Sequence, residues 1–582
     1  MKVKNSNCLR LFVPVLLLGA GVGCAADDIL PLGRMDGFYR NTAVLDRTLD
    51  RAAMMCEIPE WMTQTDFPYI KKPFPSELPF ADACSVVRLL GGWMDCKLDP
   101  HRSNDENDLA GRDENGQIFY RWNLLKARLD PYVEQGYELT LVLDNFSHCF
   151  PEHGTADSRK GFGQVTPPRD MDEWYEFIHA MCQEIKRLYG EDIQGRLRFR
   201  MGTEMQDDRR FAGTFEQFCE VYDYAAKAVK EVFPEAKFGP FNRSIPHGHF
   251  ETFNGLVSGN VGLLKLAEHC ATGTNTATGE IGSPFDFVPR SFYYFSGIKE
   301  DGKLTNIQPD ERTPEFKLMW DTVEALSPRY RGISREVQEC GPHLNTEGGI
   351  YGLDTGARGA AQTLDTIVGL KEVGANRIWH WEVFEKIAED KSLLMGQGWL
   401  YCVFERMRGG ELYVLPVDAA EDHGNRQKAL LSVKDEEAVF VVANWNADRV
   451  LHQADELTIQ IPGVRTSAAE MLSFTEVSSV YDVIRDDLKA AGLLSKKHLE
   501  HRGEPAVAVT PRGYSAMAED QAKGKQFIAD HWDKYLGLMK ASLELVPFDG
   551  ELVEQQGGNT LIRFSTACPS VTVLVMNLKQ GE

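Results

Sequence analysis

Apolar residues recur along much of the chain with two spacings, one typical of buried strands and the other typical of amphipathic helices. The short apolar runs Ser85–Gly91 and Glu138–Asp144 have the length of buried strands. Met171–Tyr189 carries large apolar residues at three- and four-residue intervals, which predicts a helix that ends at Gly190. Because strand and helix patterns alternate from about residue 84 to 410, the sequence predicts a parallel sheet with helical crossovers.

The same alternation continues through the middle of the chain. The further strands that we expect are Leu197–Glu204, Lys237–Phe241, Phe285–Tyr294, Ile333–Glu339 and Asn376–Trp381. The further helices that we expect are Tyr120–Tyr137, one capped by Thr214 and Gln217 that ends near Pro234, Phe316–Leu326 and Ala360–Val373. The strand number approaches eight, although the first strand is not evident, and no glycine-rich nucleotide motif opens a helix. A (β/α)8 TIM barrel therefore fits the pattern better than an open doubly wound sheet.

After residue 412 the pattern changes to short apolar strands separated by polar turns, as in Lys428–Val433 and Ala438–Trp445. The predicted fold class is α/β, with a (β/α)8 TIM barrel over 81–411 followed by an antiparallel β-sandwich over 412–582. Residues at about 475–545 are charged and partly helical in pattern, which indicates an insertion in the sandwich. Residues 25–80 are expected to form an irregular segment that packs on the barrel.

The first 24 residues have the pattern of an export signal. Basic residues near the start precede the apolar stretch Leu11–Gly23, which is too short to span a bilayer. The stretch ends at Cys24 in a partial lipoprotein motif, so lipidation at Cys24 and ordinary cleavage near Ala26 are both open. No later segment has the length and apolar character of a membrane span. We therefore expect an exported protein that is periplasmic, extracellular or an outer-surface lipoprotein.

Composition narrows the class of partner. The chain has 582 residues, 43% of them hydrophobic, and a formal net charge of −23. This charge argues against a nucleic-acid partner, because phosphate binding requires a basic surface. The 12 cysteines include no CxxC pair and no spacing typical of metal ligands. We therefore expect no metal and no cofactor, and most cysteines are expected to be small buried apolar residues. The oligomeric state is open.

Two glutamates lie in matching surroundings, each where a short, partly apolar strand gives way to a loop. Glu204 ends one such strand and Glu339 ends another. An α/β barrel enzyme places its catalytic groups at strand ends, and two facing carboxylates are the minimum requirement for cleaving a glycosidic bond. A solvated loop position is the alternative for each glutamate. Glu336 competes with Glu339, but strict alternation would place it on the opposite strand face, where a structural ion pair is expected.

The order of these segments resembles glycoside hydrolase family 39, which belongs to a clan of retaining TIM-barrel glycosidases and includes β-xylosidases and α-L-iduronidases. The segments that carry the resemblance are Val87–Gly91, Trp174–Gly190, Phe199–Glu204, Val337–Glu339 and Trp381–Glu385. The resemblance implies that Glu204 is the acid/base and Glu339 the nucleophile of a double displacement. Such a reaction requires carboxyl groups about 5–5.5 Å apart.

The resemblance also implies a set of substrate-binding residues, each with a structural alternative. Arg88 corresponds to an arginine near the nucleophile, or it is a partner in a core salt bridge. Trp381 forms an aromatic floor for the sugar or packs in the core, and Tyr293 contacts the nucleophile or lies at an interface. Asp144 binds sugar hydroxyls or caps a turn. Thr203 stands where the family has an asparagine that contacts the 2-hydroxyl of the sugar.

Two further positions depart from the family pattern, since Leu90 and Ser291 replace histidines. These changes put the substrate in doubt more than the mechanism. Three arginines near expected strand ends, Arg209, Arg210 and Arg290, are candidates for binding an acidic or sulfated sugar, or they are surface residues.

The sequence thus favours a retaining glycoside hydrolase that acts outside the cytoplasm on a polysaccharide or oligosaccharide. Its substrate would be a xyloside or an acidic or modified sugar, and the sequence leaves the linkage and the exo or endo mode open. The alternative from another class is a catalytically inactive carbohydrate-binding surface protein on a barrel scaffold. A purely structural lipoprotein is the third and weakest interpretation.

Overall fold

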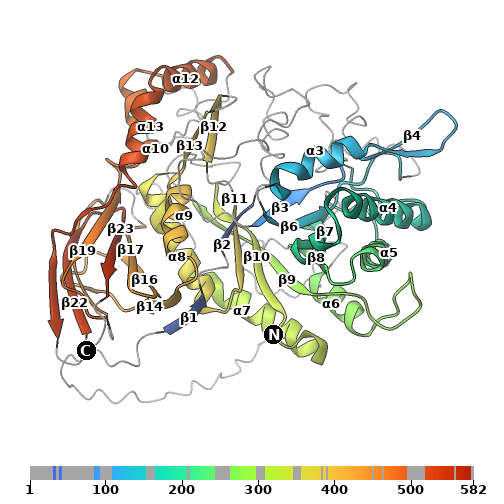
Figure 1. The fold of residues 1–582 in the computed structure, drawn as a ribbon, viewed down its shortest axis with the longest axis horizontal. Coiled ribbons are helices and arrows are strands. Elements are labelled where there is room, and N and C mark those ends of the chain that lie inside the picture. The colour runs from blue at the N-terminus through green and yellow to red at the C-terminus, as the bar shows by residue number, and fades with distance from the viewer. Residues whose placement is uncertain are drawn as a thin grey trace, which may run out of the picture.

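Two groups of sheets, joined by helices, make up the described part of the chain (Figure 1). The computed structural model describes residues 30–34, 38–41, 84–91, 108–134, 136–151, 164–205, 210–242, 262–296, 309–344, 356–381, 384–388, 391–447, 451–461, 464–493, 518–555 and 559–578. The chain therefore has the mixed α/β character that the hydrophobic pattern predicts.

The first group consists of two four-stranded parallel sheets. One has the order β3 (Cys84–Arg88), β6 (Glu138–Leu143), β7 (Leu197–Thr203) and β8 (Lys237–Asn242). The other has the order β9 (Phe287–Ser296), β10 (Ser334–Leu344), β11 (Arg377–Trp381) and β2 (Phe38–Asn41). Strand β8 lies beside β9, and β2 lies beside β3, so the two sheets adjoin at both edges.

Helices connect these strands and cover their outer side (Figure 1). They are α3 (Trp122–Val133), α4 (Met171–Tyr189), α5 (Phe215–Val232), α6 (Leu263–Thr272), α7 (Pro309–Leu326) and α8 (Ala357–Glu372). The shorter connecting elements are β4 (Ala110–Arg112), β5 (Ile118–Tyr120), η5 (Glu191–Arg196), η7 (Pro328–Tyr330), β12 (Phe384–Ala388), β13 (Lys391–Leu394) and α9 (Gly396–Met407). Helix α4 has the expected bounds, and the Thr214–Gln217 capping box at the start of α5 is present. The side chain of Asp170 caps α4 by accepting two backbone N–H groups.

The second group is formed by two antiparallel sheets. The seven-stranded sheet has the order β1 (Leu30–Arg34), β14 (Glu411–Leu415), β16 (Arg426–Lys434), β17 (Glu437–Trp445), β23 (Ser570–Asn577), β19 (Ala469–Thr475) and β20 (Val546–Pro547). The four-stranded sheet has the order β15 (Asp418–Ala419), β18 (Asp455–Ile461), β22 (Asn559–Thr566) and β21 (Glu551–Gln555). One buried apolar cluster contains residues from both sheets, including Phe440 and Ile459. Helices α10 (Val480–Ala490), α12 (Ala518–Asp530) and α13 (Trp532–Ala541) pack together beside these sheets.

Helix α8 joins the two groups. It packs against β10 on one side and against β16, β17 and β23 on the other. The buried carboxylate of Asp365 accepts hydrogen bonds from Arg426 Nε at 2.8 Å and Trp445 Nε1 at 3.1 Å. Asp482 of α10 accepts a hydrogen bond from the N–H of Ala357 at 2.9 Å and thereby caps α8. The parallel strands are therefore fixed to the antiparallel sheets through polar contacts as well as apolar packing.

Some expected elements differ from the structure. Within 25–80, which the pattern left irregular, β1 adds to the edge of the seven-stranded sheet and β2 pairs with β11. Both strands are short, so alternation has few residues in which to become visible. The hydrophobic pattern also did not predict helices α6 and α9. Helix α9 is buried along most of its length and so lacks the polar face that reveals an amphipathic helix.

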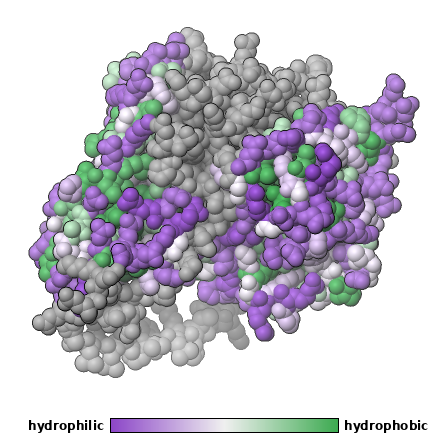
Figure 2. All heavy atoms as spheres, in the orientation of Figure 1, coloured by the Kyte–Doolittle hydropathy of each residue, from purple (hydrophilic) through white to green (hydrophobic). Residues whose placement is uncertain are grey.

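The surface agrees with the charged composition. Hydrophilic side chains cover most of the described surface in the view of Figure 2, with smaller hydrophobic areas between them. None of the helices described here combines the length and the apolar character that crossing a bilayer requires.

Gly396 provides a test of the packing between α8 and α9, and Gly537 in α13 provides the control. A Cβ atom on Gly396 would lie 2.1 Å from the backbone oxygen of Gly356, and backbone cannot move aside as a flexible side chain can. We expect Gly396→Ala to destabilise the protein by about 1–3 kcal/mol, because overpacking forces a backbone shift. Gly537, inside α13, has open space around a Cβ, so Gly537→Ala is expected to stabilise by about 0.5–1 kcal/mol. Thermal unfolding of both variants checks this, and equal shifts would contradict the close approach.

Candidate functional site

Strand register places the two candidate glutamates in one row across four neighbouring strands. Glu204 follows the last residue of β7, whereas Glu339 lies in the middle of β10, which continues to Leu344, so the expectation that Glu339 ends its strand is wrong. Thr203 of β7 pairs with Asn242 of β8, and the Asn242 amide donates to Ser291 Oγ of β9 at 2.8 Å. Ser291 in turn pairs with Glu339 of β10. Glu204 directly follows Thr203, and its backbone N–H donates to the Asn242 carbonyl at 2.9 Å. The two glutamates therefore lie at the two ends of a single row across β7, β8, β9 and β10.

Glu204 has an unusual backbone conformation. Its φ angle is 49°, in the left-handed region that residues with a side chain rarely adopt. Such a conformation costs about 1–3 kcal/mol, and these conformations cluster at functional sites. The residue is 9% exposed, and its Oε2 lies 3.0 Å from Nη2 of Arg210. The turn thus aims a largely buried carboxylate at a guanidinium on the following loop.

A bulge in β10 sets the position of Glu339. The register with β9 pairs Glu336 with Pro289 and Glu339 with Ser291, two positions on one face of β9. Because the bulge absorbs one residue between Val337 and Glu339, Glu336 and Glu339 share that face. The expectation that Glu336 faces the opposite way is therefore wrong, since strict alternation fails at a bulge. Glu339 is 3% exposed.

Glu336 is nevertheless held in a buried ion pair, as expected. Its carboxylate accepts hydrogen bonds from Arg198 of β7 and from Ser334. Arg198 also lies 3.9 Å from Glu138 at the start of β6, and Glu138 pairs with Arg377 of β11. This network lies toward the amino ends of the strands, below the row that contains Glu339. Glu336 consequently has a structural role.

A second polar layer connects β7 with β10 between the ion pair and the candidate site. Arg200 Nη1 donates to Gln338 Oε1 at 2.9 Å, and the Gln338 amide donates to Glu336 at 2.6 Å. Arg200 Nη2 donates to the Thr203 hydroxyl at 2.8 Å. We call these two layers, formed by Arg198, Arg200, Glu336 and Gln338, the cross-strand ladder. The ladder ends directly below Thr203 and therefore holds the residue that precedes Glu204.

The other expected site residues occupy their expected strands. Asp144 directly follows β6, is 3% exposed and lies at the same strand end as Glu204. Arg88, Tyr293 and Trp381 lie in β3, β9 and β11, where only their backbone is described. Their proposed contacts with a sugar stay predictions. Cys24 lies outside the described residues.

The three candidate arginines separate into different environments. Arg210 lies beside Glu204, whereas Arg209 is outside the described residues. Arg290 is fully buried and faces α7, with Nη1 2.7 Å from Met319 Sδ and its guanidinium 5.0 Å from the centre of the Phe316 ring. Arg290 is therefore a core residue and not a sugar ligand. Strand β9 extends to Ser296, so Arg290 lies well inside the strand and not at its end.

The structure adds a polar pair that the sequence did not reveal. His148, in the segment after β6, makes two contacts with the buried carboxylate of Asp108: its backbone N–H and its Nδ1 both lie 2.7 Å from Asp108 Oδ2. Asp108 precedes β4, and the backbone of its neighbour Leu109 bonds to Leu90, just beyond β3. The pair therefore lies at the same strand end as Glu204. No sequence spacing reveals it, because the two residues are 40 positions apart and belong to separate loops.

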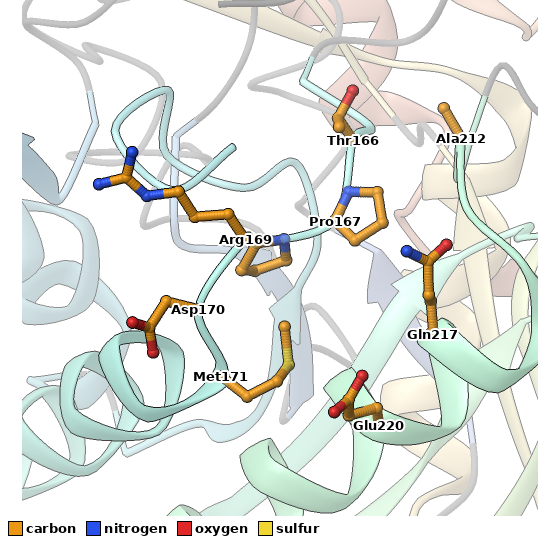
Figure 3. A pocket seen from close by; sticks show the side chains of 9 residues that line it. Thr166, Pro167, Arg169, Asp170, Met171, Ala212, Gln217 and Glu220 are labelled. Atoms are coloured by element: carbon orange, nitrogen blue, oxygen red, sulfur yellow. The ribbon is translucent and has the colours of Figure 1, made fainter. Parts of the chain in front are cut away.

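A pocket of about 590 Å³ lies beside the first turns of α4 and α5 (Figure 3). Asp170 and Gln217 line it, but their polar side chains already cap these helices. In Figure 3 the side chains of Arg169 and Asp170 extend to the left, away from those of Gln217 and Glu220. Neither candidate glutamate lines this pocket. In the described residues, no three His, Cys, Asp or Glu side chains are grouped to hold a metal ion.

The comparisons with known proteins agree with the sequence pattern. Residues 102–326 match the sequence model of Glycosyl hydrolases family 39. An α-1,4-L-rhamnosidase of Formosa agariphila is 30% identical over 166 residues, which cover 26% of this chain and 32% of that protein. A β-xylosidase of Caldicellulosiruptor saccharolyticus is 26% identical over 152 residues, covering 25% of this chain and 28% of that protein. The resemblance to family 39 is therefore confirmed, although the match spans at most about a third of these relatives.

Solved structures share the fold at low sequence identity. A family 39 enzyme from Xanthomonas axonopodis pv. citri superposes with a TM-score of 0.57 and 13% identity, covering 89% of this chain and 91% of that one. A monomeric β-xylosidase from Caulobacter crescentus CB15 gives a TM-score of 0.55 and 13% identity, covering 94% and 98%. Both comparisons extend over nearly the whole chain, so the second group of sheets is included in the shared fold.

The cross-strand ladder provides a test of how the site is supported. Glu336→Ala leaves Arg198, whose side chain is 8% exposed, without its nearest carboxylate. We expect a loss of about 3 kcal/mol in the free energy of unfolding, because breaking one side of a buried pair strands the other charge. The control is Glu551→Ala, which removes an exposed pair with Arg563 and is expected to change nothing measurable. Chemical denaturation measures the free energy of unfolding of both variants. Equal values for the two would show that the ion pair in the ladder does not stabilise the fold.

Proposed function

We propose that this protein is a retaining O-glycosyl hydrolase in which Glu204 is the acid/base and Glu339 the nucleophile. The observation that supports the proposal is the row across β7–β10, with Glu204 at one end of the row and Glu339 at the other. The family match over residues 102–326 supports the reaction class. The curated relatives are named for cleaving rhamnosides and xylosides, so a neutral or deoxy sugar is the first class to test.

The proposal includes the architecture that the sequence predicts. We infer that the two four-stranded parallel sheets form one closed (β/α)8 barrel, because they adjoin at both edges and helices cover their outer side. In ring order Glu204 then follows the fourth strand and Glu339 lies in the seventh. Both lie on the side of the cross-strand ladder that is nearer the carboxyl ends, where barrel enzymes assemble their sites. The two antiparallel sheets with a common core are the proposed β-sandwich.

In the proposed first step, Glu339 attacks the anomeric carbon while Glu204 gives its proton to the departing oxygen. A glycosyl–enzyme ester forms at Glu339 and the glycosidic bond breaks. In the second step Glu204, now ionised, takes a proton from water, and the water oxygen displaces Glu339. Burial of Glu339 suits a nucleophile that must be dry and fixed in position. Glu204 directly follows β7, and the mechanism requires that a leaving group and water reach it there.

The position of Arg210 beside Glu204 opposes the protonation of Glu204 that the first step requires. Its guanidinium lies 3.0 Å from Glu204 and favours the ionised carboxylate, whereas the first step requires the protonated one. The proposal therefore requires that the substrate draws Arg210 away, or that the proton is taken up at lower pH. Arg210 is also the described arginine that is placed to meet an acidic group on a substrate.

The second candidate function is carbohydrate binding without catalysis. The pairing of Glu204 with Arg210 and the changed side chains at Thr203 and Ser291 are the observations that favour it. Against it, a binding site gains nothing from a buried second carboxylate at Glu339, whose desolvation is costly. The experiment on the two glutamates distinguishes these functions.

We also propose that the protein is exported, with Cys24 lipidated or with cleavage near Ala26. This rests on residues 1–24 alone, which lie outside the described residues. The mass of the mature N-terminal peptide distinguishes the two forms.

Nucleophile rescue tests the roles of the two glutamates. A panel of aryl glycosides is assayed with wild type, Glu204→Ala, Glu339→Ala and the control Glu551→Ala, which changes an exposed glutamate. We expect each catalytic variant to lose at least about a thousandfold in kcat, with Glu551→Ala retaining most activity. Azide is expected to restore turnover in both catalytic variants, giving a glycosyl azide of retained configuration with Glu204→Ala and of inverted configuration with Glu339→Ala.

Three results would oppose this assignment. Equal turnover by wild type and Glu339→Ala would remove Glu339 from the mechanism. Azide products with the two configurations exchanged would reverse the roles of the glutamates. Saturable oligosaccharide binding without turnover of any glycoside by wild type would support the binding protein.

The pH–rate profile tests the influence of Arg210. If Glu204 must be protonated in the first step, the alkaline limb of kcat/KM reports its loss of that proton. Removing a cation makes the ionised carboxylate less favourable, so Arg210→Gln is expected to move this limb to higher pH. The acidic limb, which reports the nucleophile, is expected to stay in place. A shift of the alkaline limb to lower pH, or an equal shift of both limbs, would contradict the proposed role of Arg210.

A further inference from the structure

A buried asparagine, Asn242, lies between the two glutamates, and the oxygen of its side-chain amide has no hydrogen-bond partner among the described residues. Asn242 ends β8 and has no exposed surface. Its Nδ2 donates to Ser291 Oγ at 2.8 Å, but its Oδ1 has no hydrogen-bond partner among the described residues. A buried polar atom without a partner costs about 1–3 kcal/mol, so such atoms are rare unless a ligand or water satisfies them. The Asn242 amide oxygen is therefore a candidate contact for a bound molecule.

The neighbours of Asn242 locate this oxygen at the proposed site. The backbone carbonyl of Asn242 accepts the N–H of Glu204 at 2.9 Å, and its amide holds Ser291, the register partner of Glu339. The residue thus touches the acid/base side of the row through its backbone and the nucleophile side through its side chain. In the structure the oxygen of Ser291 accepts the Asn242 N–H, and the amide oxygen Oδ1 is the end without a partner among the described residues. The free end of the amide is then its acceptor.

The two positions that depart from the family pattern on either side of Asn242 strengthen this inference. Thr203 stands where an amide is usual, and its hydroxyl is engaged by Arg200 at 2.8 Å. Ser291 stands where a histidine is usual, and its small side chain leaves room for the Asn242 amide. Thr203 and Ser291 are the register partner and the hydrogen-bond partner of Asn242. The substitutions on both sides thus coincide with an amide supplied from β8.

We propose that Asn242, held by Ser291, determines specificity by accepting a hydrogen bond from one hydroxyl of the sugar bound between Glu204 and Glu339. This inference rests on the proposed glycosidase function. It assigns to Asn242 of β8 the amide contact that Thr203 of β7 is unable to make. The ligand class is a sugar with a hydroxyl donor at one particular carbon. A sugar without that hydroxyl leaves Oδ1 unsatisfied and is bound less well in the transition state.

The test uses the aryl glycoside that wild type cleaves best, together with each of its monodeoxy derivatives. For wild type we expect one derivative to lose at least about tenfold in kcat/KM, as expected for a lost hydrogen bond to a buried acceptor. Asn242→Leu, which is similar in size and has no acceptor, is expected to lower kcat/KM on the parent glycoside. On the critical monodeoxy derivative it is expected to cause little further loss. This convergence is a signature that a merely structural change does not produce.

Ser291→Ala provides a second, milder variant if Asn242→Leu is not folded. Loss of the Ser291 hydroxyl frees the Asn242 amide to rotate, so we expect the discrimination between parent and derivative to fall while the protein melts near the wild-type temperature. Full wild-type discrimination in the variant that folds, either Asn242→Leu or Ser291→Ala, would overturn the assignment to Asn242. Absence of any wild-type turnover would instead refute the proposed function, so the two failures are distinguishable.

Discussion

The buried ladder that crosses from β7 to β10 is the interaction on which the candidate site depends. Its two arginines, Arg198 and Arg200, reach Glu336 and Gln338 on a strand that is not their neighbour. A buried ion pair is weak support for stability, since desolvation offsets much of its attraction. Its stronger effect is on geometry, because a guanidinium hydrogen bond has a fixed direction and fixes the height of one strand against another. The ladder therefore fixes the height of β7 against that of β10.

Both glutamates occupy irregular backbone directly above this ladder. Glu204 adopts a left-handed conformation after β7, and Glu339 follows a bulge in β10. Each irregularity turns a carboxylate in a direction that regular strand geometry would not give. Such backbone persists only where the surroundings determine it, and the hydrogen bond from Arg200 to Thr203 holds the residue before Glu204. The regular strand segments that contain the ladder thus support the irregular backbone at Glu204 and Glu339.

The sequence predicted elements well where periodicity had room to develop, and poorly where pairing partners decide the conformation. Helix α4 was predicted to the residue because six buried apolar side chains recur along one face. The bulge before Glu339 was not predictable, since it exists only relative to β9. Arg290 was misplaced for a related reason, because the end of β9 is set by pairing with β10 and not by composition. Glu204 was found by its position after a strand, but the strand predicted to end at Glu339 continues to Leu344. Asn242 could be recognised only from its contact with Ser291.

The changed residues around the glutamates are better explained by a change of substrate than by a loss of chemistry. A site released from selection for catalysis has no reason to keep Glu204 in a conformation that costs about 1–3 kcal/mol. It also has no reason to keep Glu339 buried, at 3% exposure, on a bulged strand. The substituted positions, by contrast, are the ones whose side chains would meet the sugar and not its anomeric carbon. In the proposed function, recognition and bond cleavage are carried by different residues, so the first can change while the second is kept.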